Sequence, residues 1–388
     1  MIGLSSSTSR SHFRWRVAGI AALTAVTTVA ALVGCSSSTT SETPAASGTA
    51  GEPSYYPADY SKIIATSKKE GGTLTIYSNT DQENWAPILR DFQAKYPWIT
   101  VSADNLDSDE VFQRQLSEMA TGNAPADMLV SNAVQAWSSY ASKPGTLMDY
   151  TSPEMAKLPK FAQLMPGVSA MSLDPVGIAY NTTLMPKAPT SVADLAKAIA
   201  SDPGKYKDKI TTRDVNGAWG FSVSDAFAAE SPKAWSTLGK VLPSARPETS
   251  SGTQKEKILS GEYLAGFFIS SAVGYPAETQ SGGLLKFVLP KDGTVVLGRG
   301  IGITPKAPHP ATAKLFLDFV LSEAGQNAVA EGGLSSYRDN VKLTEGRHTY
   351  QEVEKLAGKD GIIRVPYEVV SESDVNSFVS KWDGMLGK

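Results

Sequence analysis

The most constraining feature of this chain is a regular alternation of β-prone runs and amphipathic stretches between residues 73 and 140. Alternating or continuous apolar runs predict strands, whereas apolar residues three and four apart predict helices. The predicted strands cover residues 73–78, 99–103 and 126–131, and the predicted helices cover residues 81–96, 107–121 and 133–140. Strands joined through helices run parallel, because each helix carries the chain back to the same end of the sheet. The pattern predicts an α/β fold with helices on both faces of a mostly parallel sheet.

A second α/β block with a weaker pattern follows. Its predicted strands cover residues 209–212, 263–269, 286–290 and 294–297, and its predicted helices include residues 311–321 and 372–385. The folded part comprises about 330 residues, which is too long for one typical core and suits two domains.

The first 34 residues have the layout of a secretory signal peptide. Three arginines lie between residues 10 and 16, and residues 17–34 are apolar or small, with threonine the only polar type. Residues 32–35 read Leu-Val-Gly-Cys, which resembles the lipobox of bacterial lipoproteins. This resemblance implies cleavage before Cys35 and lipidation of Cys35, with palmitate among the expected chains. The mature protein is then expected to be held on the outer side of the cell membrane by lipid alone.

Residues 36–54 contain only Ser, Thr, Ala, Gly, Pro and Glu. Such a segment cannot bury enough apolar surface to fold, so a flexible linker is predicted between the lipid and the body. Because Cys35 is the only cysteine of the chain, no disulfide and no thiolate ligand are expected in the body.

Charge and histidine content argue against several classes of protein. Removal of the signal arginines takes the formal net charge from −3 to −6, and no basic cluster is present, so neither nucleic acid nor anionic membrane is an expected partner. The three histidines lack metal-ligand spacing, and we expect no metal and no cofactor. No nucleophile elbow, P-loop or G-x-G-x-x-G fingerprint occurs, and only His309 and His348 lie in the body. We therefore expect that the chain is not an enzyme.

Six motifs in the same order resemble the family 1 extracellular solute-binding proteins, in the branch of ferric-iron, phosphonate and sugar-phosphate binders. The motifs are residues 70–78 (EGGTLTIYS), 92–99 (FQAKYPWI), 126–131 (ADMLVS), 176–181 (VGIAYN), 289–296 (LPKDGTVV) and 307–326 (APHPATAKLFLDFVLSEAGQ). The resemblance implies a type II periplasmic-binding-protein fold, in which two α/β lobes joined by two crossover strands close on a solute by hinge motion.

The resemblance also implies a division of the chain and a set of partners. The expected segments are a signal peptide (1–34), the lipidated cysteine with its linker (35–54), a first lobe (55–178 plus about 288–335) and a second lobe (179–287 plus about 336–388). The protein is expected to be a monomer that captures a small solute for the permease and ATPase of an ABC importer. A solute-sensing lipoprotein that engages a membrane receptor kinase is the alternative, because the sequence does not separate the two.

Polar loops follow several of the predicted strands. In open α/β sheets, ligands bind beyond the carboxyl ends of strands, where loops lead into helix N-termini that favour anions. The loops of this kind contain the candidate ligand contacts Ser78, Asn79, Thr80, Ser131, Asn132, Asp214, Asn216, Gly217, Ser250 and Ser251. Ser, Thr, Asp and Asn are also the preferred helix N-caps, so capping and ligand contact both remain open for each position.

Residues 270 and 271 separate two kinds of ligand. Ferric-binding relatives are expected to carry two adjacent tyrosines at the positions where this chain has Ser270 and Ser271. Neutral hydroxyls cannot offset the cost of stripping water from a trivalent ion. We therefore expect an organic or phosphorylated solute, anionic or polyhydroxylated, with both serines among its contacts, and ferric iron is the alternative.

Three larger side chains complete the candidate site. Arg299 follows the expected return crossover and could bind a carboxylate or phosphate, although a surface arginine on a turn is the competing interpretation. Trp219 and Phe268 are candidate stacking walls for a ring, but large aromatic residues more often belong to a core.

Overall fold

A computed structural model describes residues 52–341 and 348–386, all of which belong to one compact unit, Ser47–Lys388. The predicted signal peptide, Cys35 and almost all of the predicted linker lie outside the described residues. Within the described residues, none of the helices has both the length and the apolar character needed to cross a membrane.

The strands form a single connected sheet in the order β2-β1-β3-β10-β5-β8-β6-β7, with β11 beside β10 and both β4 and β9 beside β5. The strands are β1 (Thr73–Ser78), β2 (Thr100–Asn105), β3 (Met128–Ser131), β4 (Gln163–Met165), β5 (Val168–Asn181), β6 (Ile210–Arg213), β7 (Ala245–Glu248), β8 (Ala265–Ser270), β9 (Leu285–Val288), β10 (Thr294–Ile303) and β11 (Ile362–Arg364). Parallel pairs form the outer parts, β2-β1-β3 at one end and β7-β6-β8 at the other.

Two long strands connect these parallel parts. The first half of β5 pairs antiparallel with β10, and its second half pairs antiparallel with β8 and β9. The strand β10 pairs in turn with β3, so both strands run between the two parts. We call the part around β1–β3 the first lobe and the part around β6–β8 the second lobe. The predicted fold class, two α/β lobes joined by crossing strands, is confirmed.

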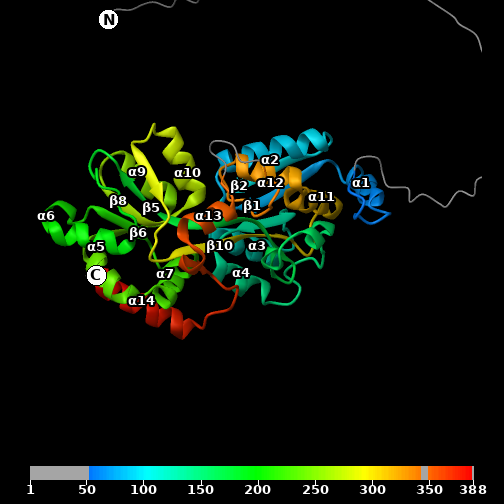
Figure 1. Ribbon diagram of the computed structural model, residues 1–388. Coiled ribbons are helices and arrows are strands. Elements are labelled where there is room, and N and C mark those ends of the chain that lie inside the picture. Colours follow the sequence, from blue (N-terminus) through cyan, green and yellow to red (C-terminus); the bar gives the residue numbers. More distant parts are fainter. Residues whose placement is uncertain (1–51, 342–347, 387–388) are drawn as a thin grey trace, which may run out of the picture. The chain divides into compact units, whose positions relative to one another are not determined.

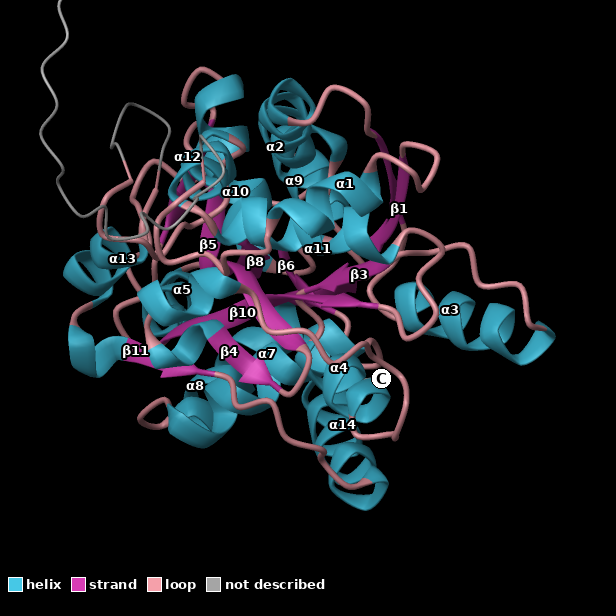
Figure 2. Cartoon of the chain, turned by 90° about the vertical axis from the view of Figure 1, so that its right-hand side faces the viewer, coloured by secondary structure: helices cyan, strands magenta, loops and turns pink. Residues whose placement is uncertain are grey.

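Helices cover both faces of the strands (Figure 2). They are α1 (Ser61–Ser67), α2 (Gln82–Lys95), α3 (Glu110–Thr121), α4 (Val134–Ala141), α5 (Val192–Ser201), α6 (Pro203–Tyr206), α7 (Ala218–Glu230), α8 (Ala234–Val241), α9 (Ser251–Leu259), α10 (Ser271–Gln280), α11 (Pro310–Leu321), α12 (Glu323–Glu331), α13 (Tyr350–Ala357) and α14 (Glu372–Leu386). In Figure 1, α1–α4, α11 and α12 lie with the first lobe, and α5–α7, α9, α10 and α14 lie with the second. The helix α8 belongs to the core of the second lobe. Short 3-10 turns lie at Pro153–Lys157, Lys160–Ala162, Leu242–Ser244 and Lys359–Gly361.

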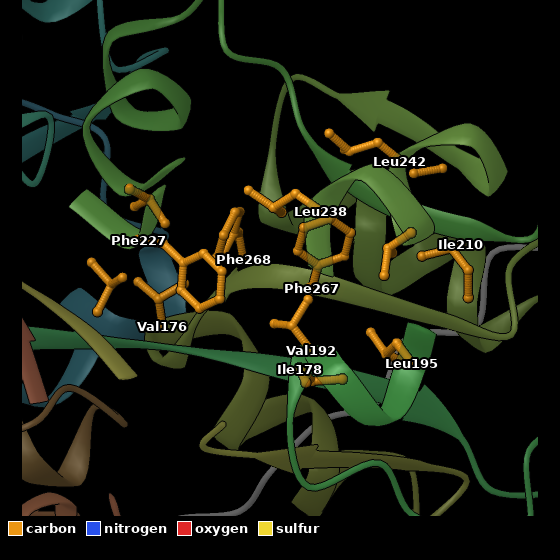
Figure 3. Close-up of a cluster of buried hydrophobic side chains, with 14 of the residues drawn as sticks. Val176, Ile178, Val192, Leu195, Ile210, Phe227, Leu238, Leu242, Phe267 and Phe268 are labelled. Atoms are coloured by element: carbon orange, nitrogen blue, oxygen red, sulfur yellow. The ribbon is translucent and has the colours of Figure 1, made fainter. Parts of the chain in front are cut away.

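Each lobe buries its own apolar core. In the first lobe, α2 contributes Trp85 and Phe92, which pack against Phe316 of α11. In the second lobe, Phe267 and Phe268 of β8 lie among aliphatic side chains of β5, α5 and α8 (Figure 3). Because each core holds its own lobe together, the crossing strands are left as the main covalent connection about which the lobes can move.

Candidate functional site

A cavity of about 380 Å³ lies between the lobes and is lined mostly by polar side chains. Five helices begin at its wall, namely α2 and α3 of the first lobe and α7, α9 and α10 of the second. Parallel strands place their carboxyl ends at a common edge, so the helices that follow them all start at this edge. The predicted contacts that line the cavity are Asn79, Thr80, Asn132, Trp219, Ser250, Ser251, Ser270 and Arg299.

The capping interpretation holds for one of these helices and not for the other four. Ser250 caps α9, because its hydroxyl accepts a hydrogen bond from the Thr253 N–H at 3.0 Å. The N-cap residues of α2, α3, α7 and α10 form no side-chain cap bond to their own helices. Free N–H groups at helix N-termini carry partial positive charge and favour anions. At α7 the N–H of Ala218 donates to the Asp109 carboxylate of the first lobe at 3.3 Å. The ends of α2, α3 and α10 therefore remain as uncapped helix N-termini at one polar cavity.

The carboxylate of Asp174, on the crossing strand β5, organises the floor of the cavity. It is almost fully buried and accepts hydrogen bonds from the hydroxyl of Ser270 at 2.7 and 2.9 Å, from Ser271 at 3.2 Å, and from the amide of Asn132. A buried carboxylate is tolerated only when such donors compensate its charge. Three predicted ligand contacts thus have a structural partner that sequence reasoning missed.

Arg299, on the crossing strand β10, lies beside Asp174 and is only 2 % exposed. Its guanidinium donates to Thr80 at 2.8 Å and to Asn79 at 3.1 Å, and forms an ion pair with Asp174 at 3.6 Å. Burial lowers the pKa of Arg299, and the Asp174 carboxylate acts in the opposite direction. The interpretation as a surface arginine on a turn is therefore wrong, because Arg299 is buried within a strand at the cavity.

Arg213, the last residue of β6, is a second buried arginine at the cavity, and sequence reasoning missed it. Its side chain is 8 % exposed and its guanidinium lies 4.5 Å from the ring centroid of Trp219. No ion pair or hydrogen bond of its side chain is found among the described residues, and its Nε is buried without a partner. Burial lowers the pKa of Arg213 to about 10, while nearby acids, Asp107 first among them, raise it. The guanidinium therefore stays protonated at neutral pH.

The remaining predicted contacts do not line the cavity. Ser78 and Ser131 are buried and accept hydrogen bonds from N–H groups two residues further along the chain, at 2.9 and 3.1 Å. Asp214 accepts from the backbone and side-chain N–H groups of Asn216, which shapes the loop before α7. Ser271 donates a hydrogen bond to Asp174, and Gly217 is the N-cap of α7.

Phe268 belongs to the core of the second lobe and does not line the cavity. The competing interpretation as a core residue is therefore correct. Its φ of 58° is unusual for a residue with a large side chain.

The wall of the cavity also carries acidic residues that the sequence did not single out. Asp81 and Asp107 belong to the loops that lead into α2 and α3, and Glu110 is the first residue of α3. Asp81 accepts a hydrogen bond from the Asn105 amide at 3.0 Å. Carboxylates of this kind accept hydrogen bonds from hydroxyl groups. The first lobe therefore offers acceptors, and the arginines and helix ends offer donors.

A two-lobed α/β fold with a polar cavity between the lobes defines a solute-binding protein of the periplasmic type. Residues 88–355 match the family of bacterial extracellular solute-binding proteins, and the chain belongs to this family. The family resemblance seen in the sequence motifs is thus confirmed.

Several solved structures share this fold. The substrate-binding protein of an ABC transporter from Agrobacterium tumefaciens is 21% identical with a TM-score of 0.74, over 82% of this chain and 96% of that chain. The periplasmic binding protein AfuA from Actinobacillus pleuropneumoniae, with fructose 6-phosphate bound, is 23% identical with a TM-score of 0.63, over 81% and 99%. Iron-bound HitA from Pseudomonas aeruginosa is 20% identical with a TM-score of 0.60, over 81% and 99%. No curated protein sequence matches this chain significantly.

Proposed function

We propose that this protein captures an anionic, polyhydroxylated small solute between its lobes and presents it to the permease and ATPase of an ABC importer. The observation that carries the proposal is Arg213, a buried and protonated guanidinium at the cavity that forms no ion pair or hydrogen bond with an acid among the described residues. A buried charge without a partner costs several kcal/mol, and an anionic group of the solute would offset this cost.

The surroundings of Arg213 support an anion with a carbohydrate-like body. The uncapped ends of α2 and α10 add N–H donors beside the two arginines. Trp219 places an indole ring in the same wall, and an indole can pack against the apolar face of a sugar. Hydroxyl groups of the solute would donate to the carboxylates of Asp81 and Asp107.

The donor set argues for an organic anion over a directly bound ferric ion. Among the described residues, the side chains that line the cavity include no tyrosine, histidine or cysteine. The cavity wall does carry three carboxylates, but no group of three or more acidic, histidine or cysteine side chains among the described residues is arranged to hold a metal ion. The two arginines would also repel a small trivalent ion. Ferric binding stays the alternative that the experiment below includes.

The placement of the contacts supports closure of the two lobes on the solute. Arg299 lies on a crossing strand, Arg213 and Trp219 belong to the second lobe, and Asn79 and Thr80 belong to the first. A solute that touches both lobes binds the closed form more tightly than the open form, and so shifts the population toward closure. The permease would then recognise the closed arrangement.

We propose in addition that the mature protein is a monomer attached to the membrane through lipid on Cys35, with residues 36–54 as its linker. The basic region, apolar run and lipobox-like residues 32–35 support this. Replacement of Cys35 with serine is expected to abolish incorporation of radiolabelled palmitate and to release the protein from the membrane fraction. Continued labelling of the variant would contradict the assignment.

The solute class is tested with the purified protein in a thermal-shift panel of sugar phosphates, phosphonates, sugar acids, neutral sugars, polyamines and ferric salts. A ligand at a hundredfold excess over its dissociation constant stabilises the native state by about 2.7 kcal/mol, which raises Tm by several degrees. We expect an anionic sugar derivative to raise Tm, and Arg213→Gln to abolish this effect. Arg246→Gln is the matched control, because it removes the same charge from the neighbouring strand β7, outside the cavity.

The outcomes of the panel separate the alternatives. Stabilisation by ferric salts alone would contradict the anion proposal and favour the iron-binding function. If neutral sugars raise Tm equally in the wild type and in Arg213→Gln, the charge of Arg213 does not select the solute.

A further inference from the structure

Three helices of this protein begin at a carboxylate that comes from a distant part of the chain. Asp292 accepts hydrogen bonds from two backbone N–H groups of α5 at 3.0 and 2.9 Å. Glu70 accepts from two backbone N–H groups of α11, both at 2.9 Å. Asp109 accepts from one, the N–H of Ala218 at the start of α7, at 3.3 Å.

The third of these contacts differs from the other two in its position. Glu70 and α11 both lie in the first lobe, and Asp292 and α5 both lie in the second. Asp109 precedes α3 of the first lobe, whereas Ala218 opens α7 of the second lobe. The hydrogen bond between them therefore spans the cleft beside the cavity, where α3 and α7 both begin.

The Asp109 carboxylate and the N-terminus of α7 are complementary, because neither forms a side-chain capping bond within its own helix. Asp109 occupies the N-cap position of α3, yet its carboxylate caps nothing in its own helix. The N-cap of α7 is Gly217, which has no side chain with which to cap. A Cβ atom on Gly217 would lie 3.7 Å from the Asp109 carboxylate, so the two segments approach closely.

The hydrogen bond between Asp109 and Ala218 is long enough to be weak, as a bond that forms and breaks with lobe motion should be. Charge-assisted hydrogen bonds are usually 2.7–2.9 Å long, as the two pairs within the lobes approximately are, whereas the single Asp109 bond is longer. Burial raises the pKa of Asp109, while the Ala218 N–H and Arg213 lower it. The carboxylate thus lies in the field of the arginine that we propose binds the solute.

We propose that Asp109 is a clasp between the lobes, whose hydrogen bond to the N-terminus of α7 forms on closure, breaks on opening, and biases the solute-free protein toward the closed form. This inference rests on the proposed hinge closure. Asp109 is a positioning residue in this account, since it controls the distance between the lobes and does not line the cavity.

The clasp is tested by measuring the separation of the lobes without solute. Spin labels are attached to cysteines introduced at the exposed positions Thr121 on α3 and Glu256 on α9, in a chain whose Cys35 is replaced with serine. Pulsed electron resonance then gives the distribution of distances. We expect Asp109→Ala to raise the ratio of long to short distances about tenfold, the effect of one hydrogen bond to a charged acceptor.

Two further variants give the clasp a specific signature. Asp109→Asn keeps an acceptor oxygen and is expected to show a smaller shift than Asp109→Ala. Asp292→Ala removes a carboxylate from the N-terminus of α5 inside one lobe, and is expected to lower Tm without changing the distance distribution.

The outcome for the clasp depends only on the comparison without solute. The clasp proposal would be overturned if Asp109→Ala gave the same distance distribution as the wild type or as Asp292→Ala. Fructose 6-phosphate and orthophosphate, added as probes to the Asp109→Ala variant, test the hinge separately. An anion that raises the Tm of this variant but leaves its distribution of long and short distances unchanged would contradict the proposed closure itself.

Discussion

At the scale of single residues, the two buried arginines of the cleft differ in how their charge is compensated. Arg299 has an ion pair with Asp174 and hydrogen bonds to Asn79 and Thr80, so most of its interactions hold the floor of the cavity together. Among the described residues, the Arg213 side chain has no ion pair and no hydrogen bond, and its guanidinium lies over the Trp219 ring. We therefore expect Arg299 to contribute mainly to folding and Arg213 mainly to binding.

Substitution of Arg299 with glutamine is expected to lower the free energy of unfolding by roughly 2–4 kcal/mol. The change leaves the Asp174 carboxylate buried without its cationic partner, although three neutral donors remain. Arg213→Gln is expected to change the free energy of unfolding by less than about 1 kcal/mol, because no acid loses an ion pair. Urea denaturation of both variants measures the difference, and equal losses would contradict the division of roles.

Asp318, on α11, is expected to make stability depend on pH. Burial raises its pKa from 3.8 to about 6, against the opposing hydrogen bonds from Tyr60 and Tyr150 at 2.7 Å. The folded protein then holds the proton more tightly than the unfolded chain, so the free energy of unfolding falls as pH rises from about 4 to about 6. The fall is on the order of 3 kcal/mol. Urea denaturation across this range should show a flatter profile for Asp318→Asn, and a profile identical to the wild type would refute the assignment.

At the scale of elements, the start of α7 shows how backbone packing places a polar end at the cleft. Gly220 lies in the first turn of this helix, and a Cβ atom there would lie 1.9 Å from the carbonyl oxygen of Asp214. The missing side chain allows residues 214–217 to fold over the first turn, beside Arg213. The position of the helix end therefore depends on one close backbone contact.

Replacement of Gly220 with alanine is expected to lower the free energy of unfolding by roughly 1–3 kcal/mol and to weaken solute binding, because the loop must shift to relieve the overlap. Gly239→Ala in α8 is the matched control, since no atom lies within 4 Å of its Cβ position. That control is expected to stabilise the helix by up to about 1 kcal/mol. Chemical denaturation should give opposite signs for the two variants.

At the scale of the whole folded unit, the C-terminal segment forms a third link between the lobes. β11 pairs with β10, and the Tyr367 hydroxyl then donates to the carbonyl of Gly298 at 2.8 Å. Gln135 of the first lobe exchanges hydrogen bonds of 3.2 and 3.3 Å with the backbone of Val370, just before α14 returns to the second lobe. Residues 365–371, between β11 and α14, therefore run beside the two crossing strands and must move when the lobes move.

Trp382→Ala, on the terminal helix α14, is expected to destabilise the second lobe by roughly 3–5 kcal/mol. The indole is fully buried and stacks near Phe378 and Phe268, with centroid distances of 5.8 and 6.4 Å. Leu356→Ala, at a side chain that is 53 % exposed, is the control and should change stability by less than about 0.5 kcal/mol. Thermal denaturation measures both, and equal shifts in Tm would show that α14 is not part of the core.

The sequence by itself determined the class of fold and the general position of the site. Apolar periodicity is a local property, so the strands and helices of residues 73–140 were predictable within a few residues. Polar turn residues after strands are local as well, and eight of the predicted contacts line the cavity. The strand β10 was predicted too short, because Gly298, Gly300 and Gly302 are poor strand formers; the absent side chains make room for Leu164 and Trp137.

Only the tertiary structure decided which polar groups pair with one another. Ser270, Ser271 and Asn132 are far apart in the sequence from Asp174, and their hydrogen bonds exist because four separate elements meet at the crossing strands. The lack of an ion pair at Arg213 is likewise a tertiary property, because it depends on which segments of the chain surround the guanidinium. Hydrogen bonds and ion pairs act over a few ångströms and join parts of the chain that are distant in the sequence, so local residue patterns do not predict them.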